Sequence, residues 1–351
     1  MGYMAIRHTF FLYLIGFINL TCTATQMLSL RLFPNLSIWS LLLNFTDATA
    51  QMSTSRFISK PTRSTAPAGL VRQFCKVSSI ISSKDISRGG PTFINREGGL
   101  NFYLDISLIH LNCLIPQAGS TTWFWYSSFL QHHAEVIESR EEINILPVRH
   151  PFLRLVSAYR DKFCDGKIFT CNRNRFKKEM QEFWVPFLIS SGRLQRTEAF
   201  NEMFQTLKPS KGTNKNFWVI IEKSYGTQFS EIVQKYSNIT VTFEEFVQHV
   251  FWTYENSVGD HHWCPQTILC DVCRQDYRYI LHQEHFAEEI PYVIKKIGYN
   301  KLPNIPKKNV HGEGNSSSSY LRFYKTLSKN SILRLLEMYK NDFELLGYSL
   351  C

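Results

Sequence analysis

The stretch INILPVRHPFLRLVSAYRDKF, residues 143–163, decides the fold. Its first six residues form a short apolar run that is typical of a buried strand, and residues 152–163 have the pattern of a helix. Arg149 and Pro151 lie between these two runs. The stretch therefore predicts a strand over 143–148, a tight turn, and a helix over 152–163.

The same order of elements precedes this stretch. Residues 106–115, ISLIHLNCLI, form a continuous apolar run that suits a buried strand. Small and hydroxylic residues follow, and residues 123–131 are a helix candidate. A strand, a tight loop and a helix, repeated along the chain, imply an α/β fold in which a central parallel sheet is flanked by helices.

The remainder of the globular part reads mainly as helix. Further helices are expected at 176–190, 197–207, 243–255, 284–297 and 328–346. Residues 217–222, FWVIIE, suit either another strand or a core helix. Residues 301–319, with two prolines, two glycines and four serines, are expected to form a loop.

Composition limits the class of protein. The 351 residues, 44% of them hydrophobic, are enough for one large domain or two small ones. This composition excludes a disordered, coiled-coil or collagen-like chain. Apolar runs near membrane length occur only in the first 45 residues, which excludes a polytopic membrane protein. The net charge of +10 favours an anionic partner, either nucleic acid, an anionic lipid surface or an acidic glycan.

The N-terminal residues favour the secretory pathway. Arg7 and His8 precede an apolar run, which indicates a signal anchor or signal peptide over 1–26; the alternative is an amphipathic helix. Residues 27–100 contain a tract rich in Ser, Thr, Ala and Pro that cannot bury enough apolar area to fold, so we expect a membrane-proximal stem and linker there. The folded domain is expected over 101–351.

Glycosylation motifs and cysteines agree with that compartment. The acceptor pattern for N-glycosylation occurs at Asn35, Asn44, Asn238 and Asn315. Nine cysteines in a secretory protein favour disulfides. The candidates are Cys164, Cys171, Cys264, Cys270 and Cys273, with a clasp between the first two. A zinc site of Cys264, Cys270 and Cys273 beside His261 and His262 is the alternative, which the spacing and the oxidising compartment disfavour.

The loop after the first strand is one candidate for phosphate binding. A loop of small residues that opens a helix presents several backbone N–H groups to one point, which suits phosphate or sulfate. A plain helix cap is the alternative for its hydroxyl groups. The loop residues are Gln117, Ala118, Gly119, Ser120, Thr121 and Thr122.

A second candidate follows the second strand. Arg149 stands at the carboxyl end of that strand, where open α/β sheets bind ligands, and Ser157 follows two helical turns later. A guanidinium group and a hydroxyl group that converge there suit one phosphate. Arg154, Arg160 and Lys162 are expected to lie on a solvated face of the same helix.

Four ordered landmarks resemble the carbohydrate sulfotransferases, especially the chondroitin, dermatan and HNK-1 group. PVRHPFLRLVSAYRDKF resembles that group's 3′-phosphate motif, and CLIPQAGSTTW its 5′-phosphosulfate loop. VTFEEFVQHV with DHHWCPQTILCDVCRQDY, and the tail LSKNSILRLLEMYKNDFELLGYSL, resemble later segments of the group. The likeness covers most of residues 108–351.

The resemblance implies a P-loop-like sulfotransferase fold and a single-pass type II protein of the Golgi membrane, with a lumenal catalytic domain. It implies transfer of a sulfuryl group from 3′-phosphoadenosine 5′-phosphosulfate (PAPS) to a hydroxyl of an acidic glycan, of the chondroitin or dermatan type. Arg149 and Ser157 would hold the 3′-phosphate, and the loop over 117–122 the 5′-phosphosulfate. No metal and no nucleic acid are implied.

Two departures from the group's pattern concern chemistry. Gln117 stands where the group has a lysine, which provides a positive charge at the leaving phosphate. Either Gln117 suffices, or another cation such as Lys162 compensates, or the chain is a weak or inactive relative that binds PAPS or glycan. His150 stands where the group usually has an acid after the arginine.

The acceptor hydroxyl needs a base, for which a neutral imidazole is suited. The candidates are His132, His133 and His262. The resemblance favours His132 or His133, because related glycan sulfotransferases use a histidine between the two phosphate motifs, and a structural role is the alternative for His262. A dense basic cluster suits contact with an acidic glycan, or is a solvated start of a helix; it comprises Arg173, Arg175, Lys177 and Lys178.

Overall fold

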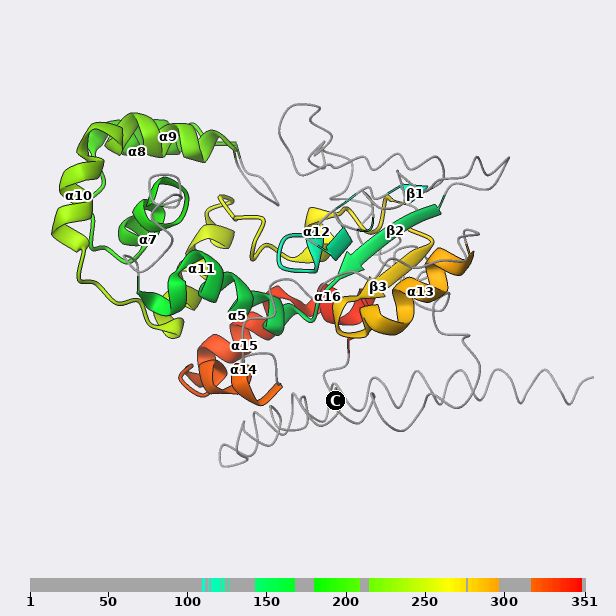
Figure 1. Ribbon diagram of the computed structural model, residues 1–351. Coiled ribbons are helices and arrows are strands. Elements are labelled where there is room, and N and C mark those ends of the chain that lie inside the picture. The colour runs from blue at the N-terminus through cyan, green and yellow to red at the C-terminus, as the bar shows by residue number, and fades with distance from the viewer. Residues whose placement is uncertain are drawn as a thin grey trace, which may run out of the picture. The chain divides into compact units, whose positions relative to one another are not determined.

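In the part of the chain that the structure describes, three strands form a parallel sheet in the order β1-β2-β3 (Figure 1). The computed structural model describes residues 109–110, 113, 115–120, 122–123, 126, 143–167, 180–208, 215–275, 277–296 and 317–348. All of them belong to one compact unit of the chain, Lys60–Tyr348. The predicted segments 1–26 and 27–100 lie outside the described residues.

The central strand is the one that the sequence predicts most clearly. Strand β2, Ile143–Val148, has the predicted bounds, and β1, Ile109–His110, lies within the predicted strand over 106–115. Ile109 pairs with Ile143, and Ile145 with Tyr279, both in parallel register. Strand β3, Tyr279–His282, was not predicted, because its four residues are too short to show a period.

Alternate residues of the strands face two different cores. Ile145 packs in a cluster with Ile290, Val293 and Ile294 of α13, Phe286–Lys296. Leu146 and Val148, which point to the other face, pack in a second cluster with Ile115, Ala118, Val272 and Leu346. The sheet is therefore covered on both faces, as the α/β prediction requires.

The helix after β2 begins where its sequence provides a cap. Helix α5 covers Pro151–Lys162, one residue from the predicted start and end, and Pro151 is its first residue. The Nδ1 atom of His150 accepts a hydrogen bond of 3.2 Å from the backbone N–H of Phe152. A predicted helix at 243–255 is also confirmed, because Thr242 and Glu245 form a capping box for α11, Phe243–Glu255.

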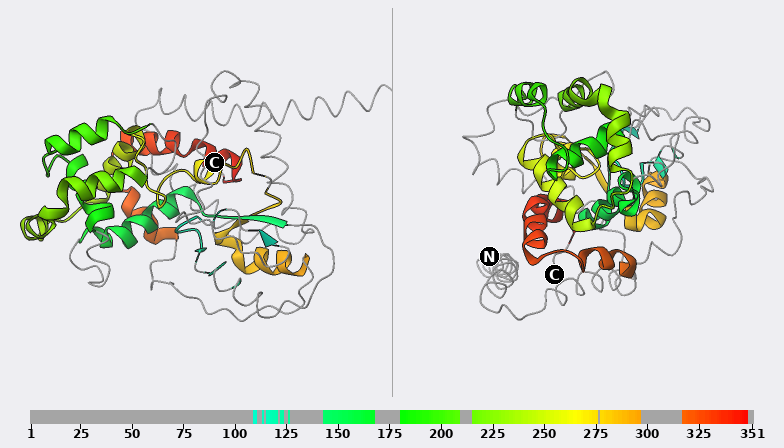
Figure 2. Two further views of the ribbon diagram at one scale, coloured as in Figure 1. Left: turned by 90° about the horizontal axis from the view of Figure 1, so that it is seen from above. Right: turned by 90° about the vertical axis from the view of Figure 1, so that its left-hand side faces the viewer.

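Most other helices gather away from the sheet, and Figure 2 shows this from two further directions. They are the π-helical turn Met180–Trp184 with α7, Val185–Ser190; α8, Glu198–Gln205; α9, Lys215–Tyr225; and α10, Phe229–Tyr236. Residues 217–222, for which a strand and a core helix were both possible, lie in α9 and are helical. A short helix α12, Gln266–Leu269, lies nearer the strands.

Two expectations for the C-terminal part are wrong. The predicted helix over 328–346 is divided at Tyr339 into α15, Lys329–Met338, and α16, Lys340–Leu345. The buried Tyr339 leaves the helical conformation at φ −99°, ψ 10°, and donates a hydrogen bond to the carbonyl of Trp263. The loop expected over 301–319 ends earlier, because α14 covers Ser317–Tyr324.

Within the residues that the structure describes, no helix has both the length and the apolar composition needed to cross a membrane.

Candidate active site

The two candidate phosphate-binding segments meet at Gln117. The Nη1 atom of Arg149 donates to the backbone carbonyl of Gln117 at 3.0 Å, and the hydroxyl of Ser157 donates to the Oε1 atom of Gln117 at 2.8 Å. The loop after β1 and the first turns of α5 therefore form one site. Arg149, Ser157 and Gln117 are each partly exposed, so a ligand can reach them.

The loop conformation depends on two residues with positive φ. Gln117 has φ 66° and Gly119 has φ 80°, a region that is open to glycine but costly for other residues. A Cβ atom at Gly119 would lie 2.4 Å from Cε2 of Phe286. The backbone N–H of Trp123 donates to the carbonyl of Gly119 at 3.1 Å, so a helical turn starts directly after the loop.

The backbone of Arg149 is held by a side chain from α12. Gln266 accepts from the N–H of Arg149 at 3.0 Å and donates to its carbonyl at 2.8 Å. Asp342, fully buried, accepts from the N–H groups of Gln266 and Thr267 at 2.8 Å each. The Arg149 guanidinium also donates to the hydroxyl of Tyr320 at 3.1 Å. The direction of Arg149 is thus fixed by elements far away in the sequence.

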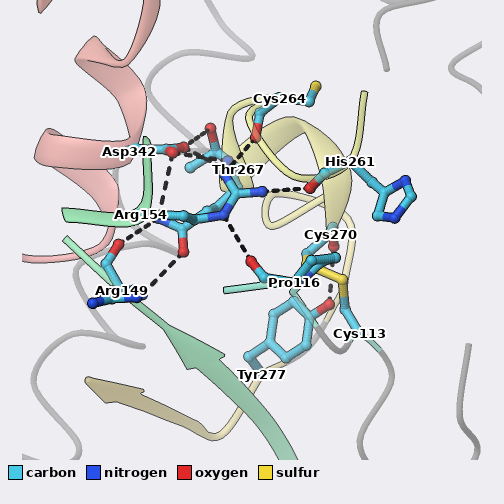
Figure 3. Close-up of a disulfide and its surroundings, with 11 residues drawn as sticks. Cys113, Pro116, Arg149, Arg154, His261, Cys264, Thr267, Cys270, Tyr277 and Asp342 are labelled. Atoms are coloured by element: carbon cyan, nitrogen blue, oxygen red, sulfur yellow. Dashed lines mark hydrogen bonds between the residues drawn. A yellow bond between two sulfur atoms is a disulfide. The ribbon is translucent and has the colours of Figure 1, made fainter. Parts of the chain in front are cut away.

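Arg154 links the loop to the segment around His261, and Figure 3 shows its side chain pointing toward Pro116, His261 and Cys264. Its guanidinium donates to the carbonyls of Pro116 at 3.1 Å, Cys264 at 2.7 Å and His261 at 2.5 Å. Only 1% of Arg154 is exposed, so the expectation of a solvated face is wrong for this residue. Three backbone carbonyls satisfy the buried charge, which explains why burial is tolerated.

A buried carboxylate orients one of the candidate bases. Asp260 Oδ1 lies 2.6 Å from Nδ1 of His262 and accepts from the backbone N–H of His262 at 2.8 Å. With Nδ1–H directed at Asp260, the Nε2 atom remains as a proton acceptor. Burial lowers the pKa of His262 to about 4 against the opposing charge of Asp260, so the imidazole is neutral at neutral and mildly acidic pH.

The end of α5 adds an ion pair to the site. Asp161 Oδ2 accepts from Gln117 Nε2 at 2.7 Å and from Lys162 Nζ at 2.9 Å. Burial acts to raise the pKa of Asp161, but the charge and hydrogen bond of Lys162 outweigh it, so the pKa lies below its usual value. The side chain of Lys162 is only 12% exposed, so it does not lie on a solvated face either.

Comparison with known proteins decides the family. The sulfotransferase family model matches residues 111–349, which include the whole site described above. The chain belongs to the sulfotransferase family. The resemblance that the sequence motifs indicated, to carbohydrate sulfotransferases, is thereby confirmed. A mostly helical fold with a small parallel sheet is compatible with that family.

Named relatives match the chain over part of their length. Carbohydrate sulfotransferase 10 of Xenopus laevis is 27% identical over 203 residues, which are 57% of this chain and 46% of the relative. The human protein of the same name is 25% identical over an equal length. Carbohydrate sulfotransferase 11 of Rattus norvegicus is 26% identical over 212 residues, 59% of this chain and 47% of the relative. The chain thus aligns with about half the length of these relatives. No solved structure matches it.

Several predicted site residues lie outside the described residues. They are Thr121, His132, His133, Cys171, Arg173, Arg175, Lys177, Lys178, Asn35, Asn44 and Asn315. The remaining loop residues are described: Ala118 is fully buried, whereas Ser120 and Thr122 are partly exposed. The glycosylation candidate Asn238 is exposed.

Of the four candidate cysteines that the structure describes, three are disulfide-bonded and one is not, and Cys171, the predicted partner of Cys164, lies outside the described residues. Cys270 forms a disulfide with Cys113, and Cys164 and Cys273 are also disulfide-bonded. Cys264 is a buried thiol whose pKa burial raises to about 12, so the expected disulfide there is wrong. Because Cys270 and Cys273 are both oxidised, the alternative zinc site loses two of its three thiolates.

His150 has a structural role in this chain rather than orienting Arg149. It is 6% exposed, caps α5 as described, and its backbone N–H donates to Glu284 at 2.8 Å. Burial lowers the pKa of His150 to about 4, with Glu284 opposing the shift and Arg149 adding to it. A neutral imidazole nitrogen can accept the cap hydrogen bond as a carboxylate would.

Sequence reasoning missed Gln266, Arg154 and Asp161 as parts of the site. Arg154 and Asp161 lie inside the motif over 143–163, but a sequence motif does not reveal which of its side chains are buried. Gln266 belongs to the segment HWCPQTILC, and its place beside Arg149 follows only from a contact across 117 residues.

Proposed function

We propose that this chain transfers a sulfuryl group from PAPS to a hydroxyl of a chondroitin- or dermatan-type glycan in the Golgi lumen. The observation that carries the proposal is the contact of both Arg149 and Ser157 with Gln117. A guanidinium, a hydroxyl and the N–H groups of a loop that opens a helix suit a nucleotide with two phosphate groups. In this proposal Arg149 and Ser157 bind the 3′-phosphate, and the loop over 117–122 binds the 5′-phosphosulfate.

The acceptor step needs a base, and we assign this role to His262, the one of the three candidates that lies within the described residues. The acceptor oxygen forms a bond to sulfur while the bond from sulfur to the bridging phosphate oxygen breaks, and its electron pair stays on the phosphate. The hydroxyl proton passes to Nε2 of His262. Asp260 stabilises the imidazolium that results, as a carboxylate does in other base–carboxylate pairs. The products are the sulfated glycan and 3′-phosphoadenosine 5′-phosphate.

Binding of the nucleotide product tests the site directly. Calorimetric titration of the full-length chain with 3′-phosphoadenosine 5′-phosphate should show one site. Arg149→Ala should weaken the affinity about 10- to 100-fold, because a charge-assisted pair with phosphate is lost. A titration without heat of binding, or an Arg149→Ala variant that binds as well as the unmodified chain, contradicts the assignment.

Transfer of labelled sulfate tests the acceptor class. The full-length chain with labelled PAPS should sulfate desulfated chondroitin and dermatan, and heparan-type chains less. If it binds the nucleotide but moves sulfate to no glycosaminoglycan, it is a binding protein rather than an enzyme. The neutral Gln117 is the one feature that favours this second candidate.

A further inference from the structure

The ammonium group of Lys162 lies near Gln117, the loop residue that carries no charge. Its Nζ is 2.9 Å from Asp161 Oδ2, and the same oxygen accepts from Gln117 Nε2 at 2.7 Å. One carboxylate oxygen thus holds a lysine ammonium beside the loop side chain that is neutral. The 12% exposure of the Lys162 side chain shows that it is enclosed by the protein, although long charged side chains usually extend into solvent.

Lys162 also lies on the same side as the candidate base. Its ammonium stands over the ring of Phe183, 5.5 Å from the ring centroid, and that ring contacts the imidazole of His262 edge-on at 5.5 Å. The ring of Phe183 therefore contacts both the ammonium group of Lys162 and the imidazole of His262. The charge of Lys162 contributes to the lowered pKa of His262, which is consistent with their proximity.

The site needs a cation at this point for chemical reasons. Sulfuryl transfer leaves negative charge on the bridging phosphate oxygen, and a preorganised positive group that stabilises such charge is worth about 10²- to 10³-fold in rate. Gln117 can donate a hydrogen bond but carries no charge. A phosphate dianion is a stronger competitor for an ammonium than the single carboxylate of Asp161.

We propose that Lys162 supplies the positive charge at the 5′-phosphosulfate that Gln117 does not, with Asp161 and Gln117 positioning it. This inference rests on the proposed function. It assigns a further catalytic residue. It also implies that the site still catalyses sulfuryl transfer although its loop side chain is neutral. Gln117 then acts as the hydrogen-bonded link that holds Asp161, and through it Lys162, against the loop.

A matched pair of variants on α5 tests the assignment. Lys162→Met should lower kcat about 10²- to 10³-fold and weaken binding of 3′-phosphoadenosine 5′-phosphate about tenfold. Arg160→Met removes the same charge two residues earlier, where the guanidinium pairs with Asp165 at 3.3 Å, and should change both quantities less than twofold. Equal effects of the two variants, or no effect of Lys162→Met, overturn the proposal.

Addition of a loop lysine provides a second test, and its first arm does not depend on the folding of Lys162→Met. Gln117→Lys in the unmodified chain should lower kcat rather than raise it, because the cation is already present and the hydrogen bond from Gln117 to Asp161 is lost. In the Lys162→Met background, Gln117→Lys should raise kcat at least tenfold. A large gain in the unmodified chain overturns the proposal. Failure of the proposed function is distinguishable, because the unmodified chain would then bind no nucleotide.

Discussion

The hydroxyl of Ser157 donates to the side-chain oxygen of Gln117 at 2.8 Å, although 40 positions separate them in the sequence. The other end of the same amide donates to Asp161 at 2.7 Å. One side chain thus bridges two positions on successive turns of α5, so the loop after β1 is fixed to the helix after β2 on the side where Arg149 also contacts it. A ligand of the loop must therefore also meet α5.

Replacement of Arg154 should destabilise the whole site. Arg154→Met leaves three carbonyl groups, one buried and two partly buried, without their donor, and we expect the free energy of unfolding to fall by about 3–5 kcal/mol. Urea denaturation of the full-length chain measures this. Arg160→Met is the control on the same helix and should cost less than about 1 kcal/mol. A loss of that small size for Arg154→Met would show that the carbonyls find other partners.

Substitution of Gly119 should distort the loop for two reasons that can be separated. Gly119→Ala places a Cβ atom against Phe286 and adds the cost of positive φ, about 1–2 kcal/mol. We expect affinity for 3′-phosphoadenosine 5′-phosphate to fall at least tenfold. Phe286→Leu in the same chain should recover part of the affinity, because it removes the clash but not the backbone strain. Full recovery would mean that φ at residue 119 has no cost.

The pH dependence of kcat should show the depressed pKa of the proposed base. Because His262 titrates near pH 4, kcat should be flat from pH 7 down to about pH 5 and should fall only below that. His262→Gln should lower kcat about 10²- to 10⁴-fold and leave nucleotide affinity unchanged. A profile that falls with a midpoint near 6.5 would point to a base other than His262.

Stability should also decrease in acid through His150. Its pKa is about 4 in the folded chain and 6.5 when unfolded, so the unfolded state binds more protons between these values. Its contribution is complete above pH 6.5 and is lost as pH falls toward 4, at up to about 1.4 kcal/mol per pH unit. His150→Asn keeps a cap acceptor and should flatten the dependence of unfolding free energy on pH by that amount. An unchanged slope would show that this imidazole is not buried in solution.

Whether a feature could be predicted from the sequence depends on how far apart along the chain the interacting residues lie. Strand β2, helix α5 and helix α11 follow from local patterns of apolar residues and caps, and these were predicted almost to the residue. Arg149 and Ser157 were named because strand ends bind ligands and because their motif resembles a known one. Strand β3 and the break at Tyr339 were missed, since pairing and burial decide them rather than periodicity.

The sequence by itself determined the family, the parallel α/β order of elements and the two segments that form the site, because these depend on residue type and spacing along the chain. Only the tertiary structure decided that Gln117 joins the two segments, that Gln266 holds Arg149, and that Arg154 and Lys162 are enclosed rather than solvated. The reason is that such contacts join residues far apart in the sequence, 40 positions for Ser157 and Gln117 and 117 for Gln266 and Arg149, and no local pattern records them.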